Sequence, residues 1–158
     1  MTDPFHYISR YLPVIKKIPK AEVLQIGALS EEQTAATAEA VRQARGTLTI
    51  VEAEGEKAAK KLKPNQLISV SSLSDLEWKQ TSLDWVFLLV HTASYNEEVL
   101  LEALGQIEQA VRSKRSICFV LETDAPEKWQ DILRRVFISW RIVVDKKQEE
   151  RLLFTAQK

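Results

Sequence analysis

The sequence predicts an α/β fold: a three-layer sandwich around a mixed seven-stranded sheet, with five parallel strands and a C-terminal antiparallel hairpin. Three observations predict it. Short, nearly unbroken apolar runs recur along the chain, as expected for strands that helices cover on both faces. Stretches with apolar residues three and four apart alternate with these runs, which is typical of helices packed on a sheet. The last two apolar runs are separated by only five polar residues, Lys146–Glu150, too few for the crossover of a parallel pair.

Each strand is expected at one apolar run. The five parallel strands are predicted at Val23–Ile26, Leu48–Val51, Leu67–Val70, Trp85–Val90 and Ile117–Leu121, and the hairpin strands at Arg141–Asp145 and Arg151–Thr155. Among these, Leu67–Val70 has the weakest pattern because serine interrupts it.

Helices are expected between the strands, on residues 38–44, 100–111 and 129–136, with a shorter helix at 56–62. Residues 71–82 leave room for little more than a turn. Before the first strand, Phe5, Ile8, Leu12 and Ile15 form a helical stripe that Pro13 is expected to break or kink. The chain is therefore predicted to be one domain over residues 1–158, with an N-terminal helical segment at 1–20 and a sheet domain at 21–158.

Composition and charge narrow the class of protein. The chain has 158 residues, 22 Lys and Arg against 22 Asp and Glu, and a pI of about 6.8, so it has no long-range field that would attract nucleic acid or an acidic membrane. No apolar run approaches the roughly 18 residues of a membrane helix, and Met1–Arg10 lacks the apolar core of a signal peptide. A cytoplasmic protein is expected. The single cysteine, Cys118, lies in an apolar strand and is expected to be an inert core thiol.

The order of elements resembles the Rossmann-like fold of the class I S-adenosylmethionine-dependent methyltransferases, from about Ala21 to the end of the chain. Three segments resemble motifs of the small O-methyltransferases. Val23–Ser30 (VLQIGALS) is similar to their glycine loop, Leu48–Glu52 (LTIVE) to their acidic ribose motif, and Leu83–Tyr95 (LDWVFLLVHTASY) to their fourth-strand segment.

The resemblance implies a cofactor site outside the carboxyl ends of the strands, where the strand order reverses between the first and fourth strands. The candidate cofactor-binding residues are Gly27, Ala28, Glu52, Ser72 and Asp75. Glu52 matches the family's ribose acid, and Asp75 is placed to face an adenine amino group. The plainer alternatives are a solvated strand-end carboxylate for Glu52 and a turn or cap aspartate for Asp75.

His91 is the candidate catalytic residue, because an imidazole at the mouth of this crevice can act as a general base. No partner acid is evident in its local sequence, and a surface histidine is the alternative. The metal-dependent O-methyltransferases hold a cation with an aspartate at the end of the fourth strand. The matching position here is Leu89, so no metal site is expected.

Two other features allow more than one interpretation. The tryptophans Trp78, Trp129 and Trp140 could line a pocket or an interface, or fill the core. The basic run Arg112–Ser116 replaces the family's Pro-Gly-Gly turn, and it could either contact an acidic partner or be solvated.

The glycine loop departs from the family pattern. Only Gly27 remains, and the place of a second glycine holds Glu31, followed by Glu32. Ser30 and Gln33 have the spacing of a capping box, in which the helix satisfies its own first N–H donors. Two acids in the first turn favour the helix but repel an arriving carboxylate.

The first functional hypothesis is therefore a catalytically degenerate methyltransferase-like domain that binds no cofactor and uses its surface to bind a protein partner, as an interaction or regulatory module. The alternative is an active S-adenosylmethionine-dependent O-methyltransferase with a divergent loop, supported by Glu52, Asp75 and His91. A homo-oligomer is compatible with both. A nicotinamide-dependent dehydrogenase is excluded because no G-x-G-x-x-G follows the first strand.

Overall fold

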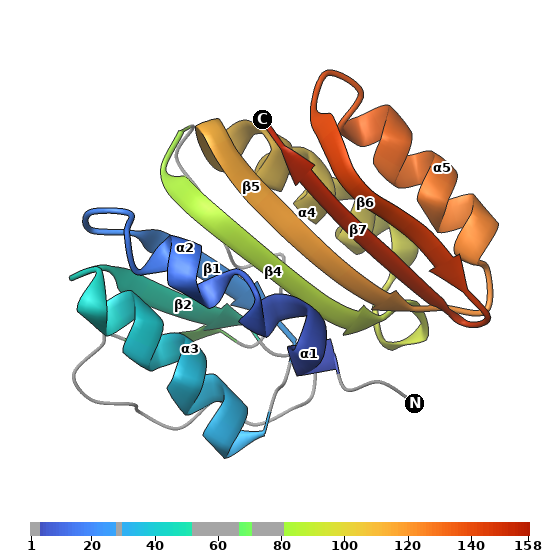
Figure 1. Ribbon diagram of the computed structural model, residues 1–158. Helices are drawn as coiled ribbons and strands as arrows, with labels where there is room; N and C mark the ends of the chain where they lie inside the picture. Colours follow the sequence, from blue (N-terminus) through green and yellow to red (C-terminus); the bar gives the residue numbers. More distant parts are fainter. Residues whose placement is uncertain (1–3, 28–29, 52–66, 71–80) are drawn as a thin grey trace.

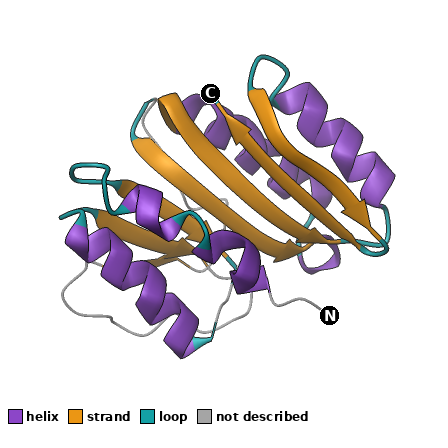
Figure 2. Ribbon diagram, viewed as in Figure 1, coloured by secondary structure: helices purple, strands orange, loops and turns teal. Residues whose placement is uncertain are grey.

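The computed structural model describes residues 4–27, 30–51, 67–70 and 81–158, which form helix, sheet and helix layers (Figures 1 and 2). The seven strands lie in the order β3-β2-β1-β4-β5-β7-β6. Neighbouring strands among β1 to β5 are parallel, whereas β7 is antiparallel to both β5 and β6. The predicted fold class is confirmed.

The strands are β1 (Glu22–Ile26), β2 (Thr47–Val51), β3 (Leu67–Val70), β4 (Leu83–His91), β5 (Val111–Glu122), β6 (Arg141–Gln148) and β7 (Arg151–Gln157). The helices are α1 (Pro4–Ser9), α2 (Leu12–Ile15), α3 (Glu31–Gln43), α4 (Glu97–Ala110) and α5 (Pro126–Val136), and a 3₁₀ turn, η2, spans Thr92–Ser94. The helix predicted at 56–62 and the turn predicted from residue 71 to 80 lie outside the described residues.

The hairpin is tighter than the sequence predicts. Strand β6 continues to Gln148, so Glu149 and Glu150 alone connect the two strands, and the expected five-residue loop is wrong. The polar residues extend the strand because β6 is an edge strand whose side chains have partners outside the core. Lys147, for example, binds Glu127 of α5, with 2.6 Å between its Nζ and Oε1.

Strand β5 also begins six residues before the predicted start, directly after α4, and this places the basic run inside the strand. The pairing of β4 with β5 shifts at this point, because Leu83 pairs with Val111 but Trp85 pairs with Ser116. The irregularity surrounds Asp84, which is almost fully buried.

Two arginines of the basic run bind Asp84. The Nη1 of Arg112 lies 2.7 Å from Oδ2 of Asp84, and the Nε of Arg115 lies 3.3 Å from its Oδ1. The backbone N–H of Glu22 also donates to Asp84 over 2.9 Å. Burial raises the pKa of the neighbouring Glu22 carboxyl. The basic run therefore binds an acid of its own chain, at the edge of the sheet where the parallel strands begin.

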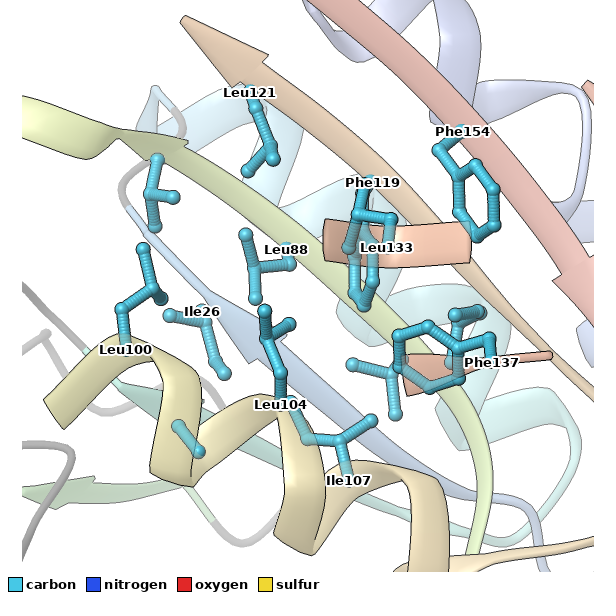
Figure 3. Close-up of a cluster of buried hydrophobic side chains, with 14 of the residues drawn as sticks. Ile26, Leu88, Leu100, Leu104, Ile107, Phe119, Leu121, Leu133, Phe137 and Phe154 are labelled. Carbon is cyan, nitrogen blue, oxygen red and sulfur yellow. The ribbon is translucent and has the colours of Figure 1, made fainter. Parts of the chain in front are cut away.

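One face of the sheet packs against α4 and α5 and forms the larger core. Figure 3 shows Leu100, Leu104 and Ile107 of α4 pointing toward the strands, with Phe119, Phe137 and Phe154 gathered nearby. Trp129 and Trp140 are buried in this cluster, so for these two the core interpretation is the one that holds. Trp78 lies outside the described residues.

The opposite face packs against α1, α2 and α3 (Figure 1). The predicted interruption of the N-terminal helix is confirmed, because α1 ends at Ser9 and α2 begins at Leu12 with Pro13 in its first turn. Tyr11, between the two helices, packs against Trp85 of β4 with 5.4 Å between ring centroids. Within the described ranges, the structure has no helix of the length and apolar character needed to cross a membrane.

Candidate functional site

The strand order reverses at β1, which pairs with β2 on one side and with β4 on the other. Their carboxyl ends, Ile26, Val51 and His91, lie at the same edge of the sheet because the three strands are parallel. In open α/β sheets, ligands bind in the crevice outside this edge at the point of reversal. This edge is therefore the candidate site.

Gly27 directly follows the last residue of β1 and lies between the ends of β2 and β4. Its N–H donates to the Val51 carbonyl over 2.8 Å, and its φ is +104°. A Cβ atom at this position would lie 1.7 Å from the carbonyl oxygen of Leu89. Both the backbone angle and the close approach of β4 require glycine here, so packing alone accounts for this residue.

The helix that follows begins with the predicted capping box. Ser30 is the N-cap of α3, its Oγ accepts the N–H of Gln33 over 3.1 Å, and the Gln33 Oε1 accepts the N–H of Ser30 over 3.2 Å. The first turn carries Glu31 and Glu32, and the Glu32 side chain is exposed. Two of the donors at this helix end are therefore bound within the helix, and the exposed Glu32 adds an acid to the same turn.

His91 ends β4 and is exposed. Its Nδ1 accepts the N–H of Ala93 over 3.3 Å and caps the turn η2. An imidazole whose Nδ1 accepts a hydrogen bond carries its neutral-state proton on Nε2. In this arrangement His91 can donate a hydrogen bond from Nε2.

An acid that the local sequence did not reveal lies beside His91. Glu122 ends β5 and pairs in register with His91 across the two strands. Its carboxylate accepts a hydrogen bond from Arg151 over 3.1 Å. The sequence could have indicated this neighbour only through the pairing of the ends of β4 and β5, and that pairing requires the strand register.

Gln25 is a second residue that the sequence interpretation passed over. It is fully buried in β1, and its Nε2 donates to the Gly27 carbonyl over 3.3 Å. Its Oε1 has no hydrogen-bond partner in the part of the chain that the structure describes. Leaving such an acceptor unpaired costs about 1–3 kcal/mol. A polar side chain in the middle of an apolar run was the available signal.

The other candidates, Ala28, Glu52, Ser72 and Asp75, lie outside the described residues, so their roles stay predictions. Among the residues that are described, no three His, Cys, Asp or Glu side chains gather in a metal-binding cluster.

Comparison with known proteins identifies the fold. No family model and no curated protein matches the sequence. Solved structures of S-adenosylmethionine-dependent methyltransferases do match the fold over nearly the whole chain, so this chain has a class I methyltransferase-like fold.

Three of these structures show the extent of the match. A protein assigned as an S-adenosylmethionine-dependent methyltransferase from Listeria monocytogenes is 11% identical, with a TM-score of 0.70, over 98% of this chain and 97% of that one. The 1,6-didemethyltoxoflavin-N1-methyltransferase of Burkholderia thailandensis, solved with its substrate and S-adenosylhomocysteine, is 15% identical, with a TM-score of 0.62, over 98% and 78%. A chain from the complex containing the Haloferax volcanii Trm112 methyltransferase activator is 10% identical, with a TM-score of 0.65, over 97% and 88%.

Proposed function

We propose that this chain is a methyltransferase-fold domain that transfers no methyl group and acts as a protein-interaction or regulatory module. One observation carries the proposal: the capping box of Ser30 and Gln33, with hydrogen bonds of 3.1 and 3.2 Å, occupies two of the N–H groups at the helix end where a methyl donor would be held. A helix N-terminus binds an anion through N–H groups that have no other partner. Here the helix uses the Ser30 and Gln33 groups itself.

The charge at this helix end supports the same conclusion. Glu31 and Glu32 stand in the first turn of α3. Each acid stabilises the free helix by about 0.3–1 kcal/mol through the helix dipole. A methionine carboxylate at the same place would meet like charges, so the donor set does not fit the carboxylate end of S-adenosylmethionine.

Gly27 does not contradict this proposal. In the related methyltransferases the glycine loop admits the cofactor, and a retained glycine could indicate a retained site. The 1.7 Å approach of a Cβ to the Leu89 oxygen gives Gly27 a structural reason that is independent of any ligand.

A protein partner is supported by the free edge of the sheet. Ile138, Ile142 and Val143 are 82%, 42% and 56% exposed, and in the sequence they lie just before and at the start of edge strand β6. Exposed apolar side chains on an unpaired strand edge favour protein contacts. One of the similar solved chains comes from a complex with a methyltransferase activator, which supports a partner of this kind.

A second candidate function rests on Gln25. Its buried, unpartnered Oε1 in the described part of the chain is suited to accept a hydrogen bond from a ligand that enters beside Gly27. This favours an active methyltransferase in which Gly27, Ala28, Glu52, Ser72 and Asp75 hold S-adenosylmethionine. His91 would be its base.

Thermal unfolding with and without 1 mM S-adenosylhomocysteine separates the two candidates. A ligand with a Kd of 10 µM would stabilise the fold by about 2.7 kcal/mol at this concentration, which raises the Tm by about 5–10 °C for a chain of this size. The proposal predicts a shift below about 2 °C. A larger shift, together with transfer of a labelled methyl group into cell extract, would establish the enzyme instead.

A further inference from the structure

A cavity of about 260 Å³ lies on the α1 side of the sheet, away from the candidate cofactor site. Its floor comes from β5, β7 and β6, and its wall comes from the N-terminal helical segment through Tyr7 and Tyr11. Figure 1 shows α1 in front of the sheet, where it contacts β5, with α4 behind the sheet; α5 packs on the same face as α4. Of the residues that the proposed function uses, only Val143 also lines this cavity.

Strand register gives its position relative to Gly27. Leu89, against which Gly27 packs, pairs with Val120, and Val120 pairs with Leu153. Val120 and Leu153 line the cavity on the sheet face that also packs against α3. With neighbouring strands about 4.8 Å apart, the cavity begins about 10 Å from Gly27. It is therefore a separate site on the same face.

Three charged residues line the cavity: the cations Arg10 and Lys146, and the acid Asp145, whose carboxylate binds Arg134 and Gln130 of α5. Along β6, Asp145 and Lys147 bind residues of α5, whereas Val144 packs on the opposite face. Side chains alternate along a strand, so Lys146 is directed to the cavity side. Neither Arg10 nor Lys146 forms an ion pair with an acid among the described residues, although each is exposed.

The interior is largely apolar and aromatic, and the Thr155 hydroxyl is one of its few polar groups. Tyr11 donates a hydrogen bond from its hydroxyl to the Thr155 Oγ1 over 3.2 Å, which fixes the wall to β7. The Arg10 guanidinium lies 5.9 Å from the ring centroid of Tyr7. An apolar interior with a few polar groups that fix orientation is typical of small-molecule sites.

From this combination we propose that the cavity binds a small aromatic carboxylate, with its ring between Tyr7, Tyr11 and the valine and leucine floor and its carboxylate between Arg10 and Lys146. Two cations without an acidic partner in the described part of the chain favour one anionic group over a neutral or cationic one. The volume lies just below the roughly 300–1,000 Å³ of drug-sized sites, which limits the ligand to one or two rings. Such a ligand would be a small-molecule effector of the proposed regulatory module.

The test is calorimetric titration of the full chain with 2-naphthoate, and with 2-naphthamide as the neutral ligand of the same shape. The naphthoate is expected to bind and the naphthamide to bind at least fivefold more weakly. Lys146→Gln and Arg10→Gln are each expected to weaken naphthoate binding about three- to tenfold. The matched control is Lys147→Gln, on the same strand but directed to Glu127 on the other face, which should change the Kd by less than twofold.

Three results would overturn the proposal: no naphthoate binding at millimolar concentration, equal binding of the naphthamide, or equal weakening by Lys147→Gln. All three variants change exposed side chains, so the fold should persist, and circular dichroism checks this. The result is independent of the proposed function, because S-adenosylhomocysteine binding would refute a degenerate cofactor site while leaving the effect of Lys146→Gln on naphthoate unchanged.

Discussion

Substituting alanine for Gly27 tests whether this glycine is present for packing. The new Cβ would lie 1.7 Å from the Leu89 carbonyl oxygen and 2.7 Å from its carbonyl carbon. These are backbone atoms of the neighbouring strand, so relief requires β1 and β4 to separate locally. The φ of +104° adds strain for any residue with a side chain.

The magnitude follows from these two effects. Overpacking in a well-packed interior costs about 1–3 kcal/mol, and a left-handed backbone angle costs a non-glycine residue about 1–2 kcal/mol more. Alanine also lowers the conformational entropy of the unfolded chain, which stabilises the folded state by about 0.4–1 kcal/mol and offsets part of this cost. Gly27→Ala should therefore lower the free energy of unfolding by about 1–4.5 kcal/mol.

Urea denaturation measures this change, and Gly105→Ala is the matched control. Gly105 lies inside α4, and a Cβ there meets no heavy atom within 4 Å, so alanine should stabilise the chain by about 0.5–1 kcal/mol. If Gly27→Ala lowers the free energy of unfolding by less than 1 kcal/mol, the packing explanation is wrong and a ligand becomes the better reason for the glycine.

Three further predictions concern stability. Ser30→Ala removes the N-cap of α3 and should cost about 0.5–2 kcal/mol in urea denaturation; no loss would contradict the capping box. Asp84→Asn should cost about 2–4 kcal/mol because the buried carboxylate binds two arginines, whereas Asp131→Asn, in an exposed pair with Arg135, should cost under 1 kcal/mol; equal losses would contradict this. Burial raises the pKa of the Cys118 thiol from 9.0 to about 11, so the unfolded chain loses this proton first. Stability should fall as pH rises from 9 through 11, by about 2–3 kcal/mol more than in Cys118→Ala, and an identical pH profile for both proteins would contradict it.

The fold could be predicted largely from the sequence because each signal was local. Apolar runs such as Trp85–Val90 identify strands buried on both faces, and Ser30 with Gln33 identifies a helix start. The end of β6 in the hairpin was harder to predict than these features. The polar side chains of Lys146 and Lys147 look like a loop in sequence, and their strand conformation depends on the pairing with β7.

The site was less predictable because its chemistry depends on register and packing. Nothing in the local sequence marks Asp84 as buried, yet the irregular pairing of β4 with β5 places it between Arg112 and Arg115. Glu122 lies far from His91 in sequence and becomes its neighbour only through the pairing of β4 with β5.

The most direct test of the central claim is calorimetric titration of S-adenosylmethionine into the folded full-length chain. The self-capped, acidic start of α3 predicts no saturable heat up to 1 mM ligand. A one-to-one isotherm with a micromolar Kd would contradict the account, since it would mean that the methyl donor binds despite Glu31, Glu32 and the Ser30–Gln33 hydrogen bonds.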